Sequence, residues 1–203
     1  MKDVVLTISR QYGSGGDEIA AKLSKSLSVP LYTKEDIVSI AKENGVAETV
    51  FEGLEEQPTS SLLYSLVIGI QKGEKEGLSK SRGRDNVFAL QSNLINTLAS
   101  EGSGVFVGRC ADYILRNNER AVNIFVHGNL DKRAEKVSLE QNMKILKAYD
   151  FINKIDKRRR SFYNFYTNRS WGDMENYDLV INMDKLTVDS AVKLILDYIE
   201  LLK

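Results

Sequence analysis

A glycine-rich turn near the start of the chain contains residue types that could bind phosphate. Residues 4–8 before the turn are mostly apolar, and apolar residues recur at four-residue spacing after it, from Ile19 to Leu27. This pattern predicts a buried strand, a turn and an amphipathic helix. The turn contains Gly13, Ser14, Gly15 and Gly16. Glycines let backbone N–H groups approach a ligand, and a helix N-terminus attracts anions, so the turn predicts a phosphate site; a tight connection without a ligand is the alternative.

The turn departs from both common phosphate-binding patterns. In the dinucleotide pattern G-x-G-x-x-G, Glu18 occupies the place of the third glycine. In the P-loop pattern G-x-x-x-x-G-K-[ST], Arg10 replaces the first glycine, Gly15 matches the second, and Gly16 replaces the lysine. That lysine normally offsets the charge of the outer phosphates, whereas Asp17 and Glu18 add negative charge. These generic patterns alone would argue against a kinase.

An arginine follows a second apolar run, residues 105–107, where a buried strand would end. Ligands of α/β proteins bind at the carboxyl ends of the strands, and an arginine there can bind phosphate or carboxylate through two hydrogen bonds. This residue is Arg109, and Asp112, three positions later, could accept from it or from a nucleotide. The two residues predict a binding site, with a purely structural Arg–Asp pair as the alternative.

The most basic stretch of the chain is residues 154–160, KIDKRRR, which aromatic residues follow. On a helix, Asp156 would meet Arg159 and Arg160 three and four positions later. Basic residues interleaved with aromatics also occur in nucleic-acid-binding proteins. The net charge of zero, with 28 basic and 28 acidic residues, argues against that class and against binding to anionic membranes.

The elements that would position these residues alternate between strand and helix. Further strands are predicted over residues 122–126 and 177–183, and capping residues at Thr33, Asn129 and Thr187 predict the starts of three helices. This alternation predicts a three-layer α/β/α fold, in which a mostly parallel sheet carries helices on both faces. The 203 residues, 42% of them hydrophobic, suffice for one such domain with a small insertion.

Residues 46–84 do not follow this alternation and therefore predict an inserted module. Their apolar part is far shorter than the roughly 20 residues that a membrane span requires, so it predicts a buried helix, a strand or a hinge. The chain has one cysteine, Cys110, and therefore no internal disulfide. The only histidine, His127, is interpreted as structural. No signal-like segment precedes the first strand, so we expect a cytoplasmic protein.

Four segments resemble the cytidylate kinase-like family, a divergent branch of the nucleoside monophosphate kinases with a P-loop-like fold. They are ISRQYGSGGDEIA at 8–20, VFVGRCADYIL at 105–115, DKRRRSFYNFYTNRSWGD at 156–173 and NYDLVINMDKL at 176–186. That family also lacks the loop lysine, so Gly16 fits it, although a basic or neutral residue is expected at Asp17. The resemblance implies transfer of a phosphoryl group from ATP to a nucleoside monophosphate, CMP or dCMP, with Mg²⁺ as cofactor.

The resemblance also implies roles for the basic residues outside the loop. Arg159 and Arg160 would belong to a lid that closes over the phosphates, and Arg133 would lie near the donor nucleotide. Arg82 and Arg84, at the end of the insertion, would meet the acceptor phosphate; a solvated loop is the alternative. Asp184 and Lys185 would border the donor base.

Within the loop, Gly13 to Gly16 would cradle the phosphates through backbone N–H groups, and the Ser14 hydroxyl would add to them. Arg10 would replace the absent lysine, and Arg109 would hold the acceptor or orient the lid. Asp17 and Glu18 would lie beside the nucleotide, and Glu18 would either bind Mg²⁺ or repel the phosphates.

The predicted organisation is a single kinase-like domain over residues 1–203. Its parts are a core of 1–45 and 85–148, an acceptor-binding insertion of 46–84, a lid of 149–173, and a final strand and helix in 174–203. The expected partner is a small nucleotide, without nucleic acid or membrane. Two alternatives remain: a catalytically degenerate module that binds nucleotide or phosphate, and a kinase of another small metabolite.

Overall fold

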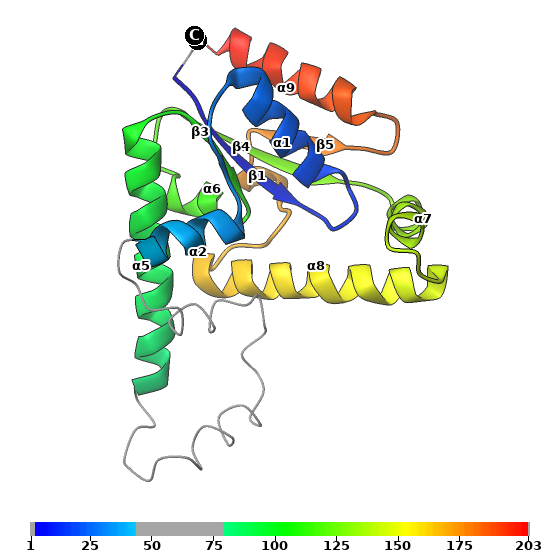
Figure 1. The fold of residues 1–203 in the computed structure, drawn as a ribbon, viewed down its shortest axis with the longest axis horizontal. Helices are drawn as coiled ribbons and strands as arrows, with labels where there is room; N and C mark the ends of the chain where they lie inside the picture. Colours follow the sequence, from blue (N-terminus) through cyan, green and yellow to red (C-terminus); the bar gives the residue numbers. More distant parts are fainter. Residues whose placement is uncertain (1–2, 44–78, 203) are drawn as a thin grey trace.

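The computed structural model describes residues 3–43 and 79–202, without the side chains of residues 79–86. In this part of the chain, five parallel strands form one sheet in the order β2-β3-β1-β4-β5 (Figure 1). The strands are β1 (Val5–Arg10), β2 (Leu31–Tyr32), β3 (Gly104–Val107), β4 (Ala121–His127) and β5 (Leu179–Asn182). Because all neighbouring pairs are parallel, the carboxyl ends of the strands meet at one edge. The sheet therefore has the ligand-binding edge that the sequence predicts.

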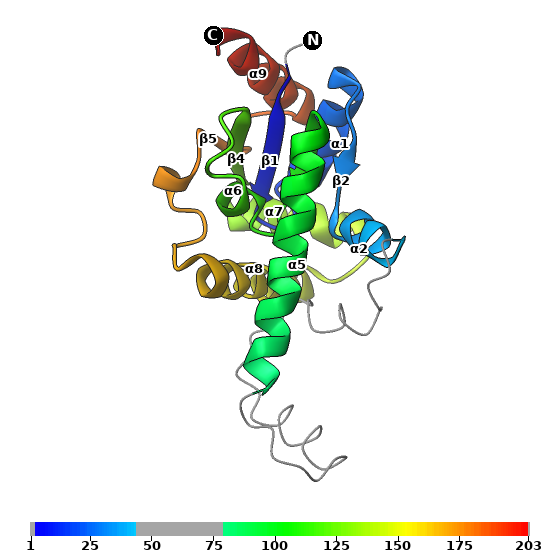
Figure 2. The ribbon, with the colours of Figure 1, turned by 90° about the vertical axis from the view of Figure 1, so that its left-hand side faces the viewer.

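Helices cover both faces of the sheet, which confirms the three-layer fold. They are α1 (Gly16–Leu27), α2 (Lys34–Glu43), α5 (Ser79–Glu101), α6 (Ala111–Ile114), α7 (Leu130–Glu140), α8 (Ile145–Thr167) and α9 (Val188–Leu201), with one 3-10 turn, η2 (Met174–Asn176). Helices α1 and α9 cover one face, and α5, α6 and α8 lie against the other (Figures 1 and 2). None of the helices in the described residues is long and apolar enough to span a membrane.

The central strand β1 supplies apolar side chains to both faces because neighbouring residues of a strand point in opposite directions. Leu6 and Ile8 are fully buried with the residues of α1 and α9. Val5 is fully buried in the second cluster, with Phe106 of β3 and Tyr163 of α8. Burying each Leu or Ile side chain stabilises the fold by about 1.5–3 kcal/mol. The unbroken apolar run thus fixes β1 at the centre of the sheet, with its carboxyl end at the ligand-binding edge.

The predicted helix caps are confirmed by side-chain hydrogen bonds. The Thr33 hydroxyl donates to Asp36 (2.7 Å), whose carboxylate also accepts from the Thr33 backbone N–H (2.9 Å). The side-chain oxygen of Asn129 accepts from the backbone N–H two residues later (2.8 Å), and that of Thr187 accepts from the N–H three residues later (3.1 Å). These bonds satisfy backbone donors at the starts of α2, α7 and α9.

Two helix boundaries differ from the prediction. The helix predicted from residue 85 begins at Ser79, inside the predicted insertion. The sequence does not reveal this earlier start, because residues 79–84 lack the apolar periodicity of a helix. The predicted lid boundary at residue 149 falls inside α8, which runs without a break to Thr167. Asn168 ends this helix with a left-handed φ of 54°. The basic cluster therefore lies on one long helix that crosses the binding edge of the sheet (Figure 1).

Candidate functional site

The glycine-rich loop joins β1 to α1, and its glycines are required for two different reasons. Gly13 and Gly15 have positive φ angles of 75° and 87°, which glycine adopts without strain. Gly13 also lies against α7, since a Cβ atom there would be 2.8 Å from Cγ2 of Val137. Gly16 begins α1, where a Cβ atom would be 2.5 Å from Cβ of Arg10. The glycines thus let the loop turn and pack closely against α7 and Arg10 as it enters the N-terminus of α1.

A lysine at position 16 is expected to impair nucleotide binding rather than restore a standard P-loop. Its Cβ would lie 2.5 Å from Cβ and 2.8 Å from Cγ of Arg10, so either the loop or Arg10 must move. Overpacking of this kind costs about 1–3 kcal/mol. We expect Gly16→Lys to weaken ATP binding by about tenfold or more in calorimetry. The control is Gly102→Lys, where no atom lies within 4 Å of the added Cβ; tighter ATP binding by Gly16→Lys would contradict the prediction.

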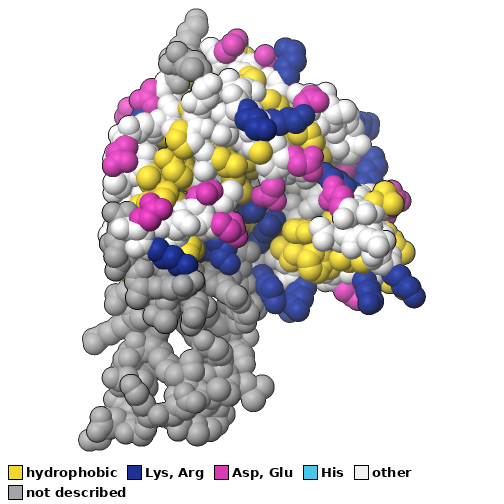
Figure 3. All heavy atoms as spheres, in the orientation of Figure 1, with side chains coloured by type: hydrophobic (Ala, Val, Ile, Leu, Met, Phe, Trp, Pro, Cys, Tyr) yellow, Lys and Arg dark blue, Asp and Glu magenta, His cyan; other side chains and the backbone are white. Residues whose placement is uncertain are grey.

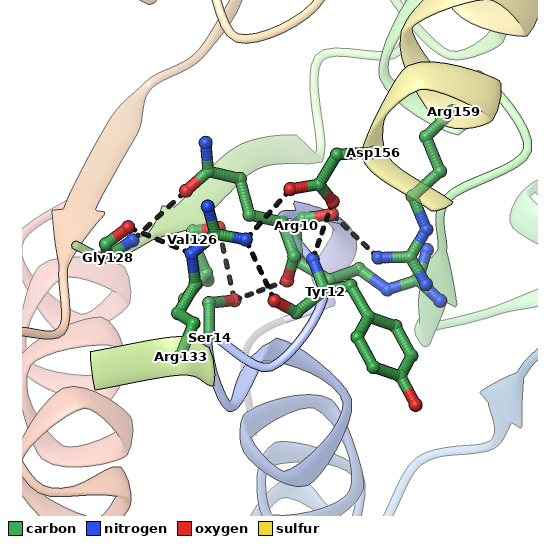
Figure 4. A network of polar contacts seen from close by, with 9 residues as sticks. Arg10, Tyr12, Ser14, Val126, Gly128, Arg133, Asp156 and Arg159 are labelled. Carbon is green, nitrogen blue, oxygen red and sulfur yellow. Dashed lines mark hydrogen bonds and ion pairs between the residues drawn. The ribbon is translucent and has the colours of Figure 1, made fainter. Parts of the chain in front are cut away.

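The hydroxyl of Ser14, predicted to face a phosphate, instead closes the loop on itself. The residue is buried, and its Oγ donates to the carbonyl oxygen of Gln11 (2.8 Å). The carbonyl oxygen of Val126 in β4 lies 3.3 Å from the same Oγ (Figure 4). The backbone N–H of Ser14 also donates to Gln11 (3.3 Å). Ser14 therefore fixes the turn from inside.

Both acidic residues in the first turn of α1 have basic partners. Nε of Arg10 donates to Oδ1 of Asp17 (2.9 Å) on one side of the loop. On the other side, the Lys136 ammonium of α7 donates to Glu18, and it lies 3.6 Å from the Glu140 carboxylate. The negative charge that seemed incompatible with phosphate binding is thus neutralised by one cation on each side.

A buried network fastens the loop to α7 and α8 (Figure 4). The Asp156 carboxylate accepts from the backbone N–H of Tyr12 and from the Arg133 guanidinium, both at 2.8 Å. Arg133 also donates to the carbonyl oxygens of Tyr12 and Gly128, both at 2.9 Å. Arg133, predicted to bind the donor nucleotide, bonds to backbone and carboxylate partners under the loop, and it also lines a cavity between the loop and the start of α9. Asp156, predicted to orient Arg159 and its neighbour, is used by this network instead.

Arginines from three segments meet in an open cleft of about 480 Å³ on one side of the loop. They are Arg10 of β1, Arg109 after β3, and Arg158 and Arg159 of α8. Nη1 of Arg159 donates to the carbonyl oxygen of Arg10 (2.9 Å), and its guanidinium lies 5.7 Å from the centre of the Tyr12 ring. The structure thus brings together three predicted residues and adds Arg158, which the sequence analysis did not assign.

The side chain of Arg109 is buried at the inner end of this cleft. Its Nε donates to Oε1 of Gln91 (2.6 Å), and Nε2 of Gln91 donates back to the Arg109 carbonyl (3.0 Å). The guanidinium lies 5.1 Å from the centre of the Phe162 ring of α8. Arg109 therefore contacts α8 through Phe162 and lines the cleft, while its predicted roles in acceptor binding and lid orientation stay predictions.

Arg160, predicted to act beside Arg159, lies elsewhere. Its guanidinium lies 5.9 Å from the centre of the Trp171 ring and lines a separate cavity of about 280 Å³ with Gln11 and His127. Neighbouring residues on a helix point about 100° apart, and here Arg160 is directed away from the cleft that Arg158 and Arg159 line. The structure therefore separates the two predicted lid arginines.

Asp112, predicted to bind substrate, lies in the core instead. The residue is buried, and its Oδ2 accepts from the Tyr163 hydroxyl (2.6 Å). Its Oδ1 is buried and makes no side-chain hydrogen bond with the described residues. Burial raises the pKa of Asp112 to about 6, although the bond from Tyr163 opposes this shift. The Asp112 carboxylate is therefore held by Tyr163, and not by Arg109 as the structural alternative considered from the sequence had it.

Asparagine at position 112 is expected to stabilise the protein above pH 6. The pKa of the Asp112 carboxyl is raised from 3.8 to about 6, so the folded state binds more protons than the unfolded state in this interval. The cost of ionising the buried group is therefore absent below about pH 4 and complete above about pH 6. We expect Asp112→Asn to raise the free energy of unfolding by on the order of 2 kcal/mol at pH 8.

The same substitution is expected to change stability little at pH 4, since the carboxyl is then protonated and the amide oxygen still accepts from Tyr163. Urea unfolding at both pH values measures the difference. Asp150→Asn on the exposed surface of α8 is the control, with expected changes below about 0.5 kcal/mol. An equal effect of Asp112→Asn at both pH values would contradict the assignment.

A second cavity, of about 260 Å³, lies on the other side of the loop. Gly13 and Gly15 form one wall, and the loop between β5 and α9 forms another. That loop contributes Met183, Asp184 and Leu186, and the other walls include Val188 of α9 and Lys132, Arg133 and Lys136 of α7. Asp184 lies there as predicted, whereas Lys185 does not line the cavity. The Oδ1 of Asp184 accepts from the Asn129 backbone (2.7 Å), which ties this loop to α7.

The remaining predictions concern residues that the structure does not place as sites. The side chains of Arg82 and Arg84, and residues 46–78 of the insertion, lie outside the described residues. Within the described residues, no three His, Cys, Asp or Glu side chains gather to hold a metal ion. Glu18, predicted to bind Mg²⁺, is held by Lys136.

Sequence comparison gives the family. The chain matches the model of the cytidylate kinase-like family over residues 5–185. It is 24% identical over 201 residues to a cytidylate kinase of Methanothrix thermoacetophila, covering 98% of this chain and 100% of that protein. It is 26% identical over 201 residues to a cytidylate kinase of Methanocella arvoryzae, covering 98% and 99%.

Solved structures share the fold of this chain. An uncharacterized protein from Eubacterium ventriosum has a TM-score of 0.74 and 28% identity, covering 98% of this chain and 99% of that one. A shikimate kinase from Bacteroides thetaiotaomicron shares the fold, with a TM-score of 0.54 and 16% identity over 98% of this chain and all of that one. The family model spans residues 5–185, which include the glycine loop, all five strands and α8, and the chain therefore belongs to the cytidylate kinase-like family.

Proposed function

We propose that the protein transfers the γ-phosphoryl group of ATP to CMP or dCMP. The observation that carries the proposal is the position of the glycine loop between two cavities, one lined by arginines and one with apolar walls. A phosphoryl group bound at the loop would face both. Family membership supports the kinase class, and the cytidylate kinases among the relatives support the acceptor.

The cavity beside α7 and α9 suits the donor. Met183, Leu186 and Val188 offer apolar walls to a planar base, and Gly13 and Gly15 present their backbone to the phosphates. An open glycine backbone at a helix N-terminus is a typical phosphate-binding arrangement. We therefore assign this cavity to ATP.

The arginine-lined cleft suits the acceptor. An oxygen of the acceptor phosphate would attack the γ-phosphorus, the bond to the β–γ bridging oxygen would break, and ADP would leave with that electron pair. The charge of the transition state spreads over the oxygens of the transferred group, and fixed cations lower its energy. Arg159, held by the Arg10 carbonyl, and Arg10 itself lie at the loop, where they would stabilise this charge. Arg109 and Arg158 would bind the acceptor.

The residues at the start of α1 fit a magnesium ion. Glu18 is the ligand predicted from the sequence. Asp17, which follows the lysine position of the P-loop pattern where the metal-binding hydroxyl normally stands, is a further candidate. Mg²⁺ is usually held in such sites by one or two carboxylates together with substrate phosphates. When bound, it neutralises charge on the donor phosphates. Arg10 and Lys136, which hold these carboxylates, would then be available to the phosphates.

The test is a coupled assay of ADP release with ATP, Mg²⁺ and CMP, dCMP, UMP, AMP, GMP or no acceptor. Release that depends on CMP or dCMP is the expected result. Release with another acceptor would keep the kinase and replace the substrate. ATP binding in calorimetry without release for any acceptor would instead support a binding module or an untested metabolite. Absence of ATP binding would overturn the assignment of the glycine loop.

A further inference from the structure

The glycine loop lacks its lysine, yet a lysine from another helix lies beside it. Lys136 belongs to α7, which packs against the loop through Val137 and Gly13. The ammonium of Lys136 lies 3.9 Å from the position that a Cβ atom on Gly15 would take. It lines the cavity that also contains Gly13 and Gly15. The side chain is thus a cation at the phosphate-binding backbone, on the side of the loop opposite Arg10.

The partners of Lys136 are carboxylates that a phosphate could replace. Its ammonium donates to Glu18 and lies 3.6 Å from Glu140. Partial burial alone would lower the pKa of Lys136, but the two carboxylates outweigh it and raise the pKa, so the side chain is charged at neutral pH. Lys132, one turn earlier, differs because it donates to the backbone carbonyl of Asp184 (2.7 Å). Of these two lysines, Lys136 is the one whose partner is a carboxylate, so a phosphate that replaced this partner would exchange one anion for another.

We propose that Lys136 is the phosphate-binding cation of the donor cavity, held at the glycine loop by Glu18 until a polyphosphate displaces the carboxylate. The ligand class is a nucleoside triphosphate or another linear polyphosphate, because a cation at Gly15 meets the phosphates and not the base. The inference rests on the proposed donor site. Glu18 acts as a positioning residue, since it touches the lysine rather than the reaction.

Calorimetric titration of the full chain with ATP and with inorganic tripolyphosphate, both in EDTA, tests the inference. Tripolyphosphate has no base, so it reports on the phosphate cradle alone. We expect Lys136→Met to weaken binding of both ligands by on the order of tenfold to a hundredfold, the effect of losing one charged hydrogen bond. Lys136→Arg should retain most of the affinity. Glu18→Gln should tighten metal-free binding, since it removes the carboxylate that competes with phosphate.

Lys193→Met removes a lysine of an exposed ion pair on α9, 3.0 Å from Asp197, and is the matched control. Wild-type affinity of Lys136→Met for tripolyphosphate would overturn the inference, whether or not ATP binding changed. Weaker metal-free binding by Glu18→Gln would overturn the proposed holding role of Glu18. If the wild-type protein bound neither ligand, the proposed donor site itself would fail, and the inference with it.

Discussion

Alanine at position 159 is expected to lower kcat for CMP phosphorylation by on the order of 10³, with a much smaller change in the Kd of ATP. The Arg159 guanidinium reaches the cleft beside the glycine loop, and the Arg10 carbonyl fixes it there at 2.9 Å. A cation in this position stabilises the charge that develops on the phosphoryl group during its transfer. Bound ATP does not yet carry this charge. Loss of the side chain therefore raises the barrier more than it weakens donor binding.

Two neighbouring substitutions sharpen this prediction. Arg159→Lys keeps the charge but not the planar guanidinium, so we expect only partial activity. Arg160→Ala is expected to change kcat by less than about tenfold, because Arg160 lies over Trp171 in a separate cavity. Steady-state kinetics with ATP and CMP measure all three variants. Equal losses for Arg159→Ala and Arg160→Ala, or unchanged turnover in Arg159→Ala, would contradict the assigned roles.

Methionine at position 133 is expected to destabilise the protein by about 3–5 kcal/mol, because it leaves the buried Asp156 carboxylate without its cation. The two side chains are only 8% and 10% exposed, and they are joined at 2.8 Å. Arg133 also donates to the carbonyl oxygens of Tyr12 and Gly128, which lose their partner in the variant. Urea unfolding measures the free-energy change. We also expect weaker ATP binding, since Tyr12 begins the glycine loop.

A double-mutant cycle separates this ion pair from general damage. Asn at position 156 keeps an oxygen for the Tyr12 N–H but removes the buried charge, so Arg133→Met with Asp156→Asn should be less destabilised than the sum of the single changes. Lys193→Met, which breaks an exposed pair, should change stability by less than about 1 kcal/mol. Strict additivity in the Arg133–Asp156 cycle would show that the two residues do not act as a pair.

The predictions differ in the part of the protein they test. Arg159 concerns charge placed for the transition state, whereas Arg133 and Asp156 concern the support of the loop. A variant such as Arg133→Met can therefore lose ATP binding because the loop loses its support, in addition to any change at the cavity wall that Arg133 forms. Measuring stability beside activity distinguishes these two causes.

Much of the fold follows from the sequence alone. The apolar run at residues 4–8 predicted the central strand because its side chains pack on both faces of a parallel sheet. Thr33, Asn129 and Thr187 predicted helix starts because their caps bond to N–H groups only two or three residues away. Strand patterns and helix caps depend on residues that are close in the sequence, so they do not depend on how distant segments pack. The insertion has no comparable spacing of apolar residues. For that reason the predicted helix begins at residue 85, whereas α5 begins at Ser79.

The candidate site was only partly predictable. The sequence predicts three site arginines because they lie at strand ends or on a basic helix, and the structure brings them into one cleft: Arg10, Arg109 and Arg159. Similar reasoning predicts Arg133 and Arg160, but the structure bonds Arg133 to Asp156 under the loop, where it also lines the other cavity, and directs Arg160 toward Trp171. The sequence pattern predicts that a basic residue lies near the binding edge of the sheet. It does not predict which group that residue will bond to.

The sequence by itself determined the order of strands and helices, the glycine loop and the supply of cations at one edge of the sheet. Only the tertiary structure decided which carboxylate each cation meets. Asp17 meets Arg10 seven residues away, whereas Glu18 meets Lys136 and Asp156 meets Arg133 across 118 and 23 residues. Backbone periodicity depends on neighbours in the chain, but a side chain's role depends on groups that folding brings from distant segments.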